Sequence, residues 1–186
     1  MSENQSGLIL PYKDKMPMLA ADVFLAPTAN VIGDVEIGAA TNLWFGVVVR
    51  GDVNHIRIGA RTNIQDGTVV HVTRGTHPTV IGSGITIGHR AMIHGCTLED
   101  GCFIGMQATV MDGAVVESGA MVGAGALVAP GKRVLRGELW VGAPARKART
   151  MTDDEHAEIL RLSDHYCEVA ATYMAAGIGR TDGKRS

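Results

Sequence analysis

Aliphatic residues recur at every sixth position along most of this chain, in four runs separated by three breaks in phase. The runs comprise Leu25, Val31, Ile37, Leu43 and Val49; Ile58, Ile64 and Val70; Ile81, Ile87 and Ile93; and Leu98, Ile104, Val110, Val116, Val122, Val128 and Val134. A period of six fits neither the period of about 3.6 of an amphipathic helix nor the alternation of a simple strand. The pattern predicts a solenoid of triangular cross-section, in which each six-residue unit forms one flat side and one corner.

The residues between the aliphatic positions indicate a narrow interior. Four residues after most of them stands a small or β-branched residue, and Gly often follows directly, where a corner demands backbone angles that Gly tolerates. The small positions are Ala29, Val35, Thr41, Val47, Thr62, Thr68, Ala91, Thr97, Ala108, Ala114, Ala120 and Ala126. Aromatic residues make up only 4% of the chain, whereas Gly occurs 24 times, which suits a core too narrow for large rings.

Breaks in the repeat divide the chain into segments. Residues 72–80, "VTRGTHPTV", combine Gly, Pro and polar residues and predict a loop that projects from the solenoid. Later, Thr152 and Glu155 have the spacing of a helix capping box, and Gly177 is a helix stop. Between them runs an apolar stripe of Ile159, Leu162, Tyr166, Val169 and Tyr173. We expect a β-solenoid over residues 10–148, a packed α-helix over 149–177 and a loose tail over 178–186.

Charge and composition exclude several classes of protein. The net charge is −2, so the chain lacks the basic surface that binds nucleic acid. No apolar run approaches the ~20 residues of a membrane span, and the N-terminus lacks the features of a secretion signal. Three cysteines are too few and too scattered for a disulfide framework. These features predict a cytoplasmic protein that binds neither nucleic acid nor a membrane.

Three of the seven histidines stand inside repeat units: His71, His89 and His94. Asn63, Gln65 and Asp66 lie near them in the sequence. Three imidazoles and a water form a catalytic zinc site with one open position, so these histidines are candidate metal ligands. The alternative interpretation is that they merely fill corners or stack between coils.

Geometry restricts how the three histidines can share an ion. Ligand nitrogens around a tetrahedral zinc lie roughly 3–3.5 Å apart, whereas five extended residues span up to ~17 Å. On the triangle, His89 and His94 are expected on successive sides with a corner between them, so they should serve different ions. A closed ring of three chains would bring His89 of the partner subunit beside His71 and His94. The sequence therefore predicts a homotrimer with metal sites between its subunits.

Four motifs, "RGDVNHIRIG", "TNIQDGTVVHV", "TIGHRAMIHGC" and "VGAPARKAR", together with the repeat, resemble the gamma-class carbonic anhydrase family. The likeness is strongest to its short bacterial cytoplasmic branch and covers about residues 10–175. It implies a left-handed parallel β-helix, a homotrimer and a Zn²⁺ ion at each subunit interface. The implied ligands are His71, His89 and His94, with His89 supplied by the neighbouring chain.

The resemblance also assigns roles around the ion. It implies that Gln65 orients the zinc-bound water and that Asn63 lines the same pocket. Arg50 and Asp52 match an intersubunit salt bridge, with an ordinary surface ion pair as the alternative. Asp66 matches a structural carboxylate, as a partner of Arg50 or of a ligand histidine, or as a corner cap.

One further residue has two interpretations. Tyr166 on the predicted helix matches an aromatic residue that covers the pocket in some relatives. Packing of the Tyr166 ring against the solenoid is the alternative. The two interpretations differ in whether the helix takes part in the site.

The implied reaction is reversible hydration of carbon dioxide to bicarbonate. Zinc lowers the pKa of its water to about 7, which makes hydroxide available at neutral pH, and Fe²⁺ or Co²⁺ fits the same three-imidazole site. Val53 follows Asp52 where the most active relatives have a glutamate, and loop 72–78 contains no acid, so slow hydration is expected, with His77 a candidate proton shuttle. The alternatives are an acyl-CoA thioesterase or acyltransferase and a non-catalytic trimeric scaffold.

Overall fold

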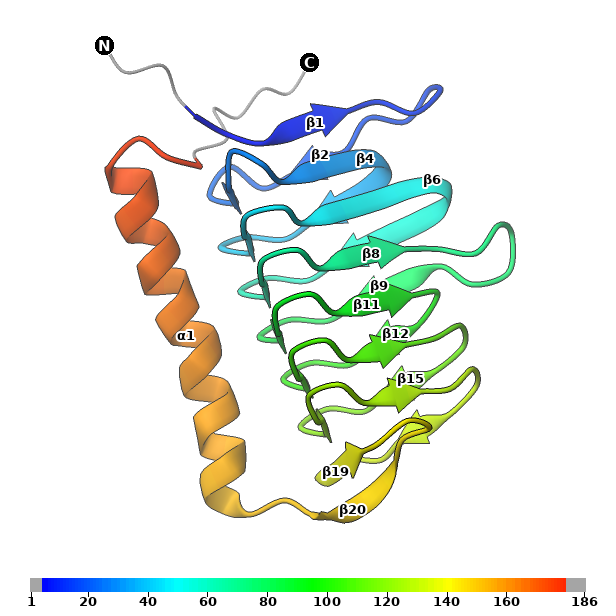
Figure 1. Ribbon diagram of the computed structural model, residues 1–186. Helices are drawn as coiled ribbons and strands as arrows, with labels where there is room; N and C mark the ends of the chain where they lie inside the picture. Colours follow the sequence, from blue (N-terminus) through cyan, green and yellow to red (C-terminus); the bar gives the residue numbers. More distant parts are fainter. Residues whose placement is uncertain (1–4, 180–186) are drawn as a thin grey trace.

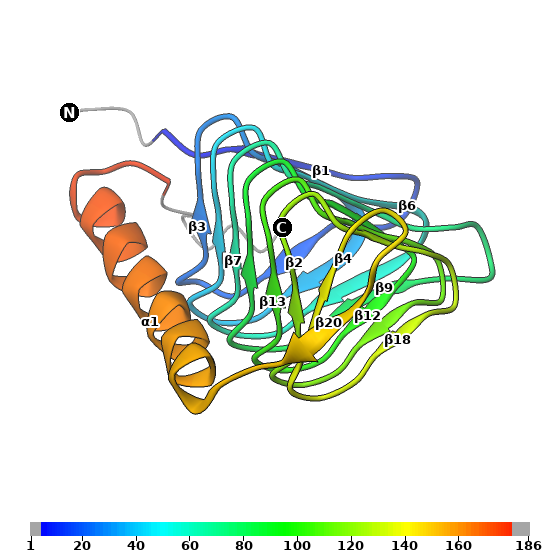
Figure 2. The ribbon, with the colours of Figure 1, turned by 60° about the horizontal axis from the view of Figure 1, so that its bottom comes forward.

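Short strands stack into three flat faces that wind around a narrow core in a computed structural model that describes residues 5–179 (Figure 1). The predicted fold class is confirmed: the chain is a left-handed parallel β-helix of about 7 turns with one C-terminal helix. Figure 2 looks toward the end of the coil and shows its three sides, with helix α1 lying along one of them. All named strand pairs in the described chain are parallel except β19 with β20.

Face 1 and face 2 share two long strands that continue around the corner between them. Face 1 contains β1 (Leu8–Leu10), β8 (Val69–His71), β11 (Met92–His94), β14 (Thr109–Val110), β17 (Leu127–Val128) and the first halves of β4 (Asn30–Ile37) and β6 (Val48–Ile58). Face 2 contains β2 (Met18–Leu19), β9 (Thr79–Ile81), β12 (Thr97–Leu98), β15 (Val115–Val116), β18 (Arg133–Val134) and the second halves of β4 and β6.

Face 3 is a separate sheet and carries the helix. It contains β3 (Phe24–Leu25), β5 (Asn42–Leu43), β7 (Asn63–Ile64), β10 (Thr86–Ile87), β13 (Phe103–Ile104), β16 (Met121–Val122), β19 (Glu138–Val141) and β20 (Arg146–Thr150). We call the turn from face 1 to face 2 corner 1–2 and the turn from face 3 to face 1 corner 3–1. These two corners bound face 1 and hold the candidate site.

The repeat positions form the core as predicted. Every aliphatic residue of the four runs is buried, with an exposed fraction of at most 4%. The small positions are also buried, with Thr97 as the exception. Because Leu98 follows Ile93 by five positions instead of six, Cys96 turns inward at that coil and Thr97 lies half-buried on the outer surface. The prediction that Thr97 fills the interior is therefore wrong.

Corner 1–2 accommodates the breaks in phase. β4 and β6 are in register up to Gly33 and Gly51 and resume pairing at Val35 and Ile56, so residues 52–55 bulge outward. Gly33 has φ +80°, and a Cβ there would lie 2.3 Å from the Gly51 carbonyl oxygen, so only glycine fits. The predicted projecting loop is present between β8 and β9 and reaches farther out than the other corners (Figure 1).

Helix α1 (Asp153–Ala175) covers face 3. Its predicted capping box is present: the Thr152 hydroxyl accepts from the Glu155 amide, and the Glu155 carboxylate accepts from the Thr152 amide. Gly177, with φ +82°, follows the last turn as predicted. Ile159, Ser163 and Ala170 are buried against β3, β5, β7 and β10, and the small Ser163 and Ala170 allow close approach.

The strands extend from β1, which begins at Leu8, to β20, which ends at Thr150, and the helix follows from Asp153. The predicted division into segments 10–148, 149–177 and 178–186 stays a prediction. In the predicted tail, the Gly179 amide donates to the Gln5 carbonyl and the Gly179 carbonyl accepts from the Leu25 amide, while residues 180–186 lie outside the described part of the chain. Over residues 5–179, no helix is both long enough and apolar enough to cross a membrane.

Candidate metal centre

His71 and His94 end the neighbouring strands β8 and β11 and stand side by side at corner 1–2. The two residues are direct partners in the parallel register. His71 Nδ1 lies 3.1 Å from His94 Nε2. This distance is close to that between two ligands of one tetrahedral zinc with bonds of about 2.0–2.1 Å. The fold has therefore brought together two side chains that are 23 residues apart in sequence.

The other ring nitrogen of each histidine contacts a carboxylate. His71 Nε2 lies 3.0 Å from Asp52 Oδ1, and His94 Nδ1 lies 2.8 Å from Asp112 Oδ1. An ionised carboxylate only accepts, so these nitrogens carry the protons of the neutral rings. The two facing nitrogens then both present lone pairs at 3.1 Å, an arrangement that a shared cation or proton reconciles.

The two carboxylates are held in the ionised form. Burial raises the pKa of Asp52, but the hydrogen bonds from His71 and Arg50 together lower it by more than burial raises it. The pKa of Asp52 therefore falls below its ordinary value. The balance at Asp112 is the same: burial raises its pKa, while hydrogen bonds from His94 and Thr73 more than offset that effect. Ionised partners of this kind orient histidine ligands and increase their basicity.

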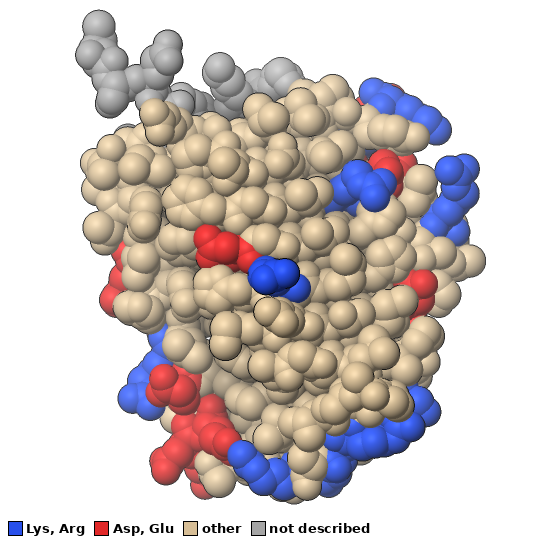
Figure 3. Space-filling model, in the orientation of Figure 1, with Lys and Arg blue, Asp and Glu red and all other residues tan. Residues whose placement is uncertain are grey.

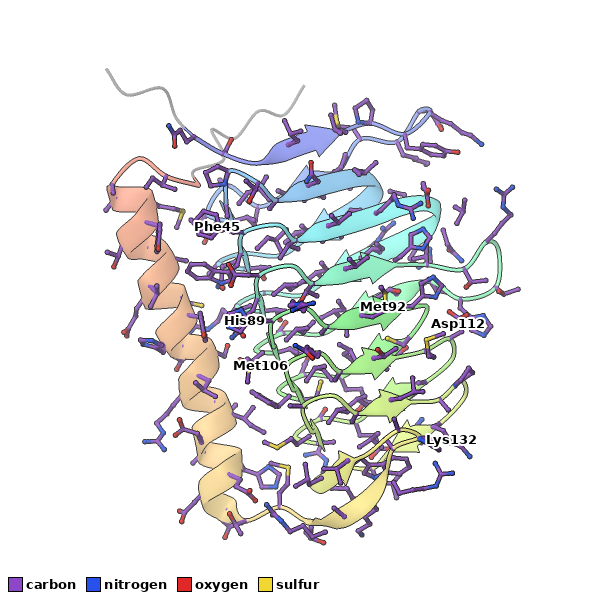
Figure 4. The ribbon with its side chains drawn as sticks, viewed as in Figure 1. Phe45, His89, Met92, Met106, Asp112 and Lys132 are labelled. Atoms are coloured by element: carbon purple, nitrogen blue, oxygen red, sulfur yellow. The ribbon has the colours of Figure 1, made fainter. Side chains whose placement is uncertain are left out.

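His89 lies at corner 3–1, at the opposite end of face 1. Figure 4 places His89 and Asp112 on opposite sides of Met92, which lies on β11. The side chain of His89 is 43% exposed, against 19% for His71 and 25% for His94. The predicted separation by a corner is wrong in detail, because β11 itself separates His89 from His94. The two residues nevertheless face different edges of the subunit.

Asp66 contacts His89 in the same way that the other two carboxylates contact their histidines. Its Oδ2 lies 2.9 Å from His89 Nδ1, which leaves Nε2 directed away from this carboxylate. Of the partners considered for Asp66, the structure thus contains the contact with a candidate ligand histidine. All three candidate ligands have an aspartate of the same chain at hydrogen-bond distance.

Gln65 and Asn63 lie on the His89 side of face 1. β7 pairs with β10 so that Asn63 is opposite Thr86, and Gln65 immediately precedes Asp66. Gln65 Nε2 donates to Asn63 Oδ1 at 3.2 Å, and Asn63 Nδ2 donates to Thr86 Oγ1 at 2.7 Å. Both side chains are buried, and the chain of bonds fixes the orientation of the Gln65 amide.

Arg50 forms its ion pair with Asp52 of the same chain. Asp52 therefore links the Arg50 guanidinium to the His71 ring, and Arg50, Asp52, His71, His94 and Asp112 form one continuous set of polar contacts along corner 1–2. The predicted intersubunit role of Arg50 and Asp52 stays a prediction.

Tyr166 packs against the solenoid. Its ring meets Trp44 edge-on at a centroid distance of 5.8 Å, and Tyr173 contacts Trp44 at 5.6 Å. The helix thus contributes a small aromatic cluster over face 3. The contact with Trp44 is the packing alternative, and a role of Tyr166 in covering a pocket stays a prediction.

Comparisons with known proteins agree with the motifs. A family model described as bacterial transferase hexapeptide (six repeats) matches residues 95–130. Gamma carbonic anhydrase 1, mitochondrial, of Arabidopsis thaliana is 49% identical over 167 residues, which cover 87% of this chain and 61% of that protein. A carbonic anhydrase of Geobacillus kaustophilus is 40% identical over 174 residues, which cover 94% of this chain and 95% of that protein. The chain belongs to the gamma carbonic anhydrase family.

Two solved structures that are similar to this gamma carbonic anhydrase family member are described as transferases. A hexapeptide transferase family protein from Anaplasma phagocytophilum has a TM-score of 0.86 and 43% identity, covering 89% of this chain and 98% of that chain. A putative acetyltransferase from Bacillus cereus has a TM-score of 0.88 and 34% identity, covering 90% and 97%. The match spans 61% of the length of the Arabidopsis relative.

Over residues 5–179 of this family member, no cluster of three His, Cys, Asp or Glu side chains in one chain is arranged to hold a metal ion. Two of the three candidate ligands meet at corner 1–2, and the third is at corner 3–1. The donor set fits a metal, because the facing nitrogens of His71 and His94 have the spacing and lone pairs that two ligands need.

Two polar residues of this corner, Asp112 and Thr73, were missed by sequence reasoning. The signal for Asp112 is present in the spacing: three sides of six residues make one turn, and Asp112 follows His94 by 18 residues. Stacked corners therefore bring these two side chains together. Thr73 carries no comparable signal, because the projecting loop interrupts the repeat.

Proposed function

We propose that this protein is a metal-dependent carbonic anhydrase that hydrates carbon dioxide reversibly at the interfaces of a homotrimer. The observation that carries the proposal is the pair of facing nitrogens of His71 and His94, which lie 3.1 Å apart. Each ring is held in this orientation by its own carboxylate. His89 of the partner subunit would complete the ligand set. Membership of the gamma carbonic anhydrase family supports the reaction.

The outer surface of face 1 supports the trimer. One outward column along the coils consists of Leu8, Asn30, Val48, Val69, Met92, Thr109 and Leu127, most of which are apolar. Phe45 and Met106 near corner 3–1 are 36% and 54% exposed. In the view of Figure 3 most of this surface is uncharged, with scattered acidic and basic side chains. An apolar face with complementary halves of a site at its two edges suits a closed heterologous ring.

The residues of this chain have distinct roles in the proposed reaction. When bound, Zn²⁺ acts as a Lewis acid that makes water nucleophilic at neutral pH, and Fe²⁺ or Co²⁺ is compatible with the same ligands. His71 and His94 hold the ion from one subunit, and the Asp52 and Asp112 carboxylates orient their rings. Gln65, fixed by Asn63, would orient the attacking water beside His89.

Slow turnover and a cytoplasmic location complete the proposal. Loop 72–78 contains no carboxylate, so proton release lacks an acidic shuttle, and His77 would take that role. Burial raises the pKa of the Cys96 thiol to about 12, so it carries little reactive thiolate.

The decisive experiment combines metal analysis with stopped-flow measurement of carbon dioxide hydration. We expect about one metal ion per chain and hydration that His71→Ala reduces to the uncatalysed background. A purified trimer without metal, or hydration that His71→Ala leaves unchanged, would contradict the proposal. Metal binding without hydration would favour the thioesterase or scaffold alternatives, which activity toward an acyl-CoA then separates.

A mixing experiment tests whether the site is shared between chains. His71→Ala and His89→Ala should each be inactive, because each variant damages every interface. If their subunits are unfolded and reassembled together, random mixing should restore roughly a quarter of the sites, since one kind of interface then has all three histidines. The control is each variant reassembled alone. No recovery in verified mixed trimers would place the ligands elsewhere.

A further inference from the structure

We propose that Asp112, held by Thr73 of the projecting loop, is a positioning residue that sets which nitrogen of His94 binds the metal. The inference rests on the proposed metal centre and adds a component that neither the ligand set nor the family motifs contain. It also gives loop 72–78 a role, because Thr73 of the loop bonds to Asp112.

The contact of Asp112 with His94 fixes the ring. Asp112 Oδ1 lies 2.8 Å from His94 Nδ1, which favours the tautomer protonated at Nδ1 and leaves Nε2 with its lone pair toward His71. Asp112 comes from the coil after His94, so its position depends on coil stacking and not on the local chain around the histidine. A ring without this partner can rotate or place its proton on Nε2, which abolishes the donor.

Thr73 also restrains the carboxylate of Asp112. The Thr73 hydroxyl lies 3.1 Å from Asp112 Oδ1 and 3.0 Å from Oδ2, so it donates between the two oxygens. Thr73 also pairs with His77 across the base of the loop through two backbone hydrogen bonds. The loop therefore helps to fix the orientation of the carboxylate that contacts His94.

Two glycines let the loop lie close to Asp112. A Cβ at Gly95 would lie 2.1 Å from Asp112 Oδ1 and 2.8 Å from His77 Cβ, and a Cβ at Gly113 would lie 3.3 Å from His77 Nε2. His77 thus occupies space that any larger residue at these corners would take. The Thr79 hydroxyl accepts from the Gly95 amide at 2.9 Å and joins the far end of the loop to the same corner.

The test measures metal affinity, which a purely structural role would not change selectively. Wild type, Asp112→Asn and Asp100→Asn are titrated with Zn²⁺ against a competing chelator, and the absorption spectrum of the Co²⁺ form is recorded. Asp100 is a matched control: it also precedes a corner glycine with positive φ and bonds to the adjacent coil, through the Ser83 amide at 2.7 Å, away from the histidines. All variants are checked for thermal unfolding and trimer formation.

We expect Asp112→Asn to weaken Zn²⁺ binding about 10- to 100-fold and to alter the Co²⁺ spectrum, as loss of an outer partner of a metal-ligating histidine does. Asp100→Asn should bind as wild type does. Equal affinities of Asp112→Asn and wild type would overturn the proposal while leaving the metal centre intact. Wild type that binds no Zn²⁺ would remove the metal centre and this inference together.

Thr73→Val keeps the proposal testable should Asp112→Asn fail to fold. The substitution preserves the branched shape and removes the hydroxyl, so we expect a smaller loss of affinity in the same direction. In the Asp112→Asn background, Thr73→Val should add nothing further, because the hydroxyl acts through the carboxylate. Additive losses would show that Thr73 acts by another route and would overturn its assigned role.

Discussion

The coils before residue 95 and the coils after it use the same repeat with different regularity. The earlier coils contain the long strands β4 and β6, the bulge at residues 52–55 and the projecting loop. The later coils, from β12 to β18, consist of two-residue strands at constant spacing. The candidate ligands all lie in the irregular part, and the regular part contributes Asp112. The repeat provides rigid stacking, and departures from it bring polar side chains to a corner.

Sequence separations express this difference. Along corner 1–2, Asp52 precedes His71 by 19 residues and His71 precedes His94 by 23, whereas Asp112 follows His94 by the regular 18. Extra residues leave the coil as bulge or loop: Asp52 is the first residue of the bulge, and the loop lies between His71 and His94, which still stack. An insertion at this corner can therefore change what surrounds the histidines without disturbing the core.

The largest expected effect comes from shortening one buried isoleucine in the coils before residue 95 and one in the coils after it. Ile64 and Ile104 are both fully buried and both pair with Ile87 from opposite sides. Each change to Ala should lower the free energy of unfolding by about 2–5 kcal/mol through lost contacts and a cavity. Chemical denaturation measures this effect. Only Ile64→Ala, next to Asn63 and Gln65, should also weaken Zn²⁺ binding. Equal weakening by Ile104→Ala would contradict the division into irregular coils that hold the candidate ligands and regular coils that do not.

A smaller effect compares two glycines of corner 1–2. Gly95 and Gly131 have φ of +55° and +67°, so alanine costs roughly 1–2 kcal/mol of stability at each. A Cβ at Gly131 meets nothing within 4 Å, whereas one at Gly95 meets the Asp112 carboxylate. Thermal unfolding and Zn²⁺ titration should show that Gly95→Ala alone loses metal affinity. The comparison fails if Gly131→Ala loses as much.

The helix cap should have a smaller and purely structural effect. Thr152→Ala removes the hydroxyl that accepts from the Glu155 amide and should cost about 1 kcal/mol of stability. Zn²⁺ affinity should not change, because the cap lies at the regular end of the solenoid. Thr172→Ala is the control, since that hydroxyl donates only to the Glu168 carbonyl within the helix. A loss of metal affinity in Thr152→Ala would connect the helix start to the site.

The smallest expected effect is the pH dependence of this cap. Hydrogen bonds from Arg149 and from the Thr152 amide lower the pKa of Glu155 to about 2, from 4.5. Because the folded pKa is lowered, the stabilisation is complete above pH 4.5 and is lost as the pH falls toward 2. Denaturation at several pH values should show the difference between wild type and Glu155→Gln shrinking over that window. A constant difference would exclude the ion pair as its source.

Much of the fold could be predicted from the sequence, and part of the site could. Every aliphatic position of the four period-six runs is buried, the capping box and Gly177 marked the start and the end of the helix, and loop 72–78 projects as expected. Thr97 was misplaced because one shortened unit changes which residue faces inward. The separation of His89 from His94 followed from chain reach alone, although the strand and not a corner separates them.

The sequence by itself determined a coiled stack with polar residues at its corners, because the repeat dictates which side of each short strand is apolar. Only the tertiary structure decided that Asp52 meets His71 and that Asp66 meets His89, whereas the regular spacing of 18 residues already stacks Asp112 on His94. These pairs join different coils, and their register depends on how many residues leave the coil between them. The number of residues in the bulge and in the loop can be assigned only from the backbone, which shows where each of them rejoins the stack.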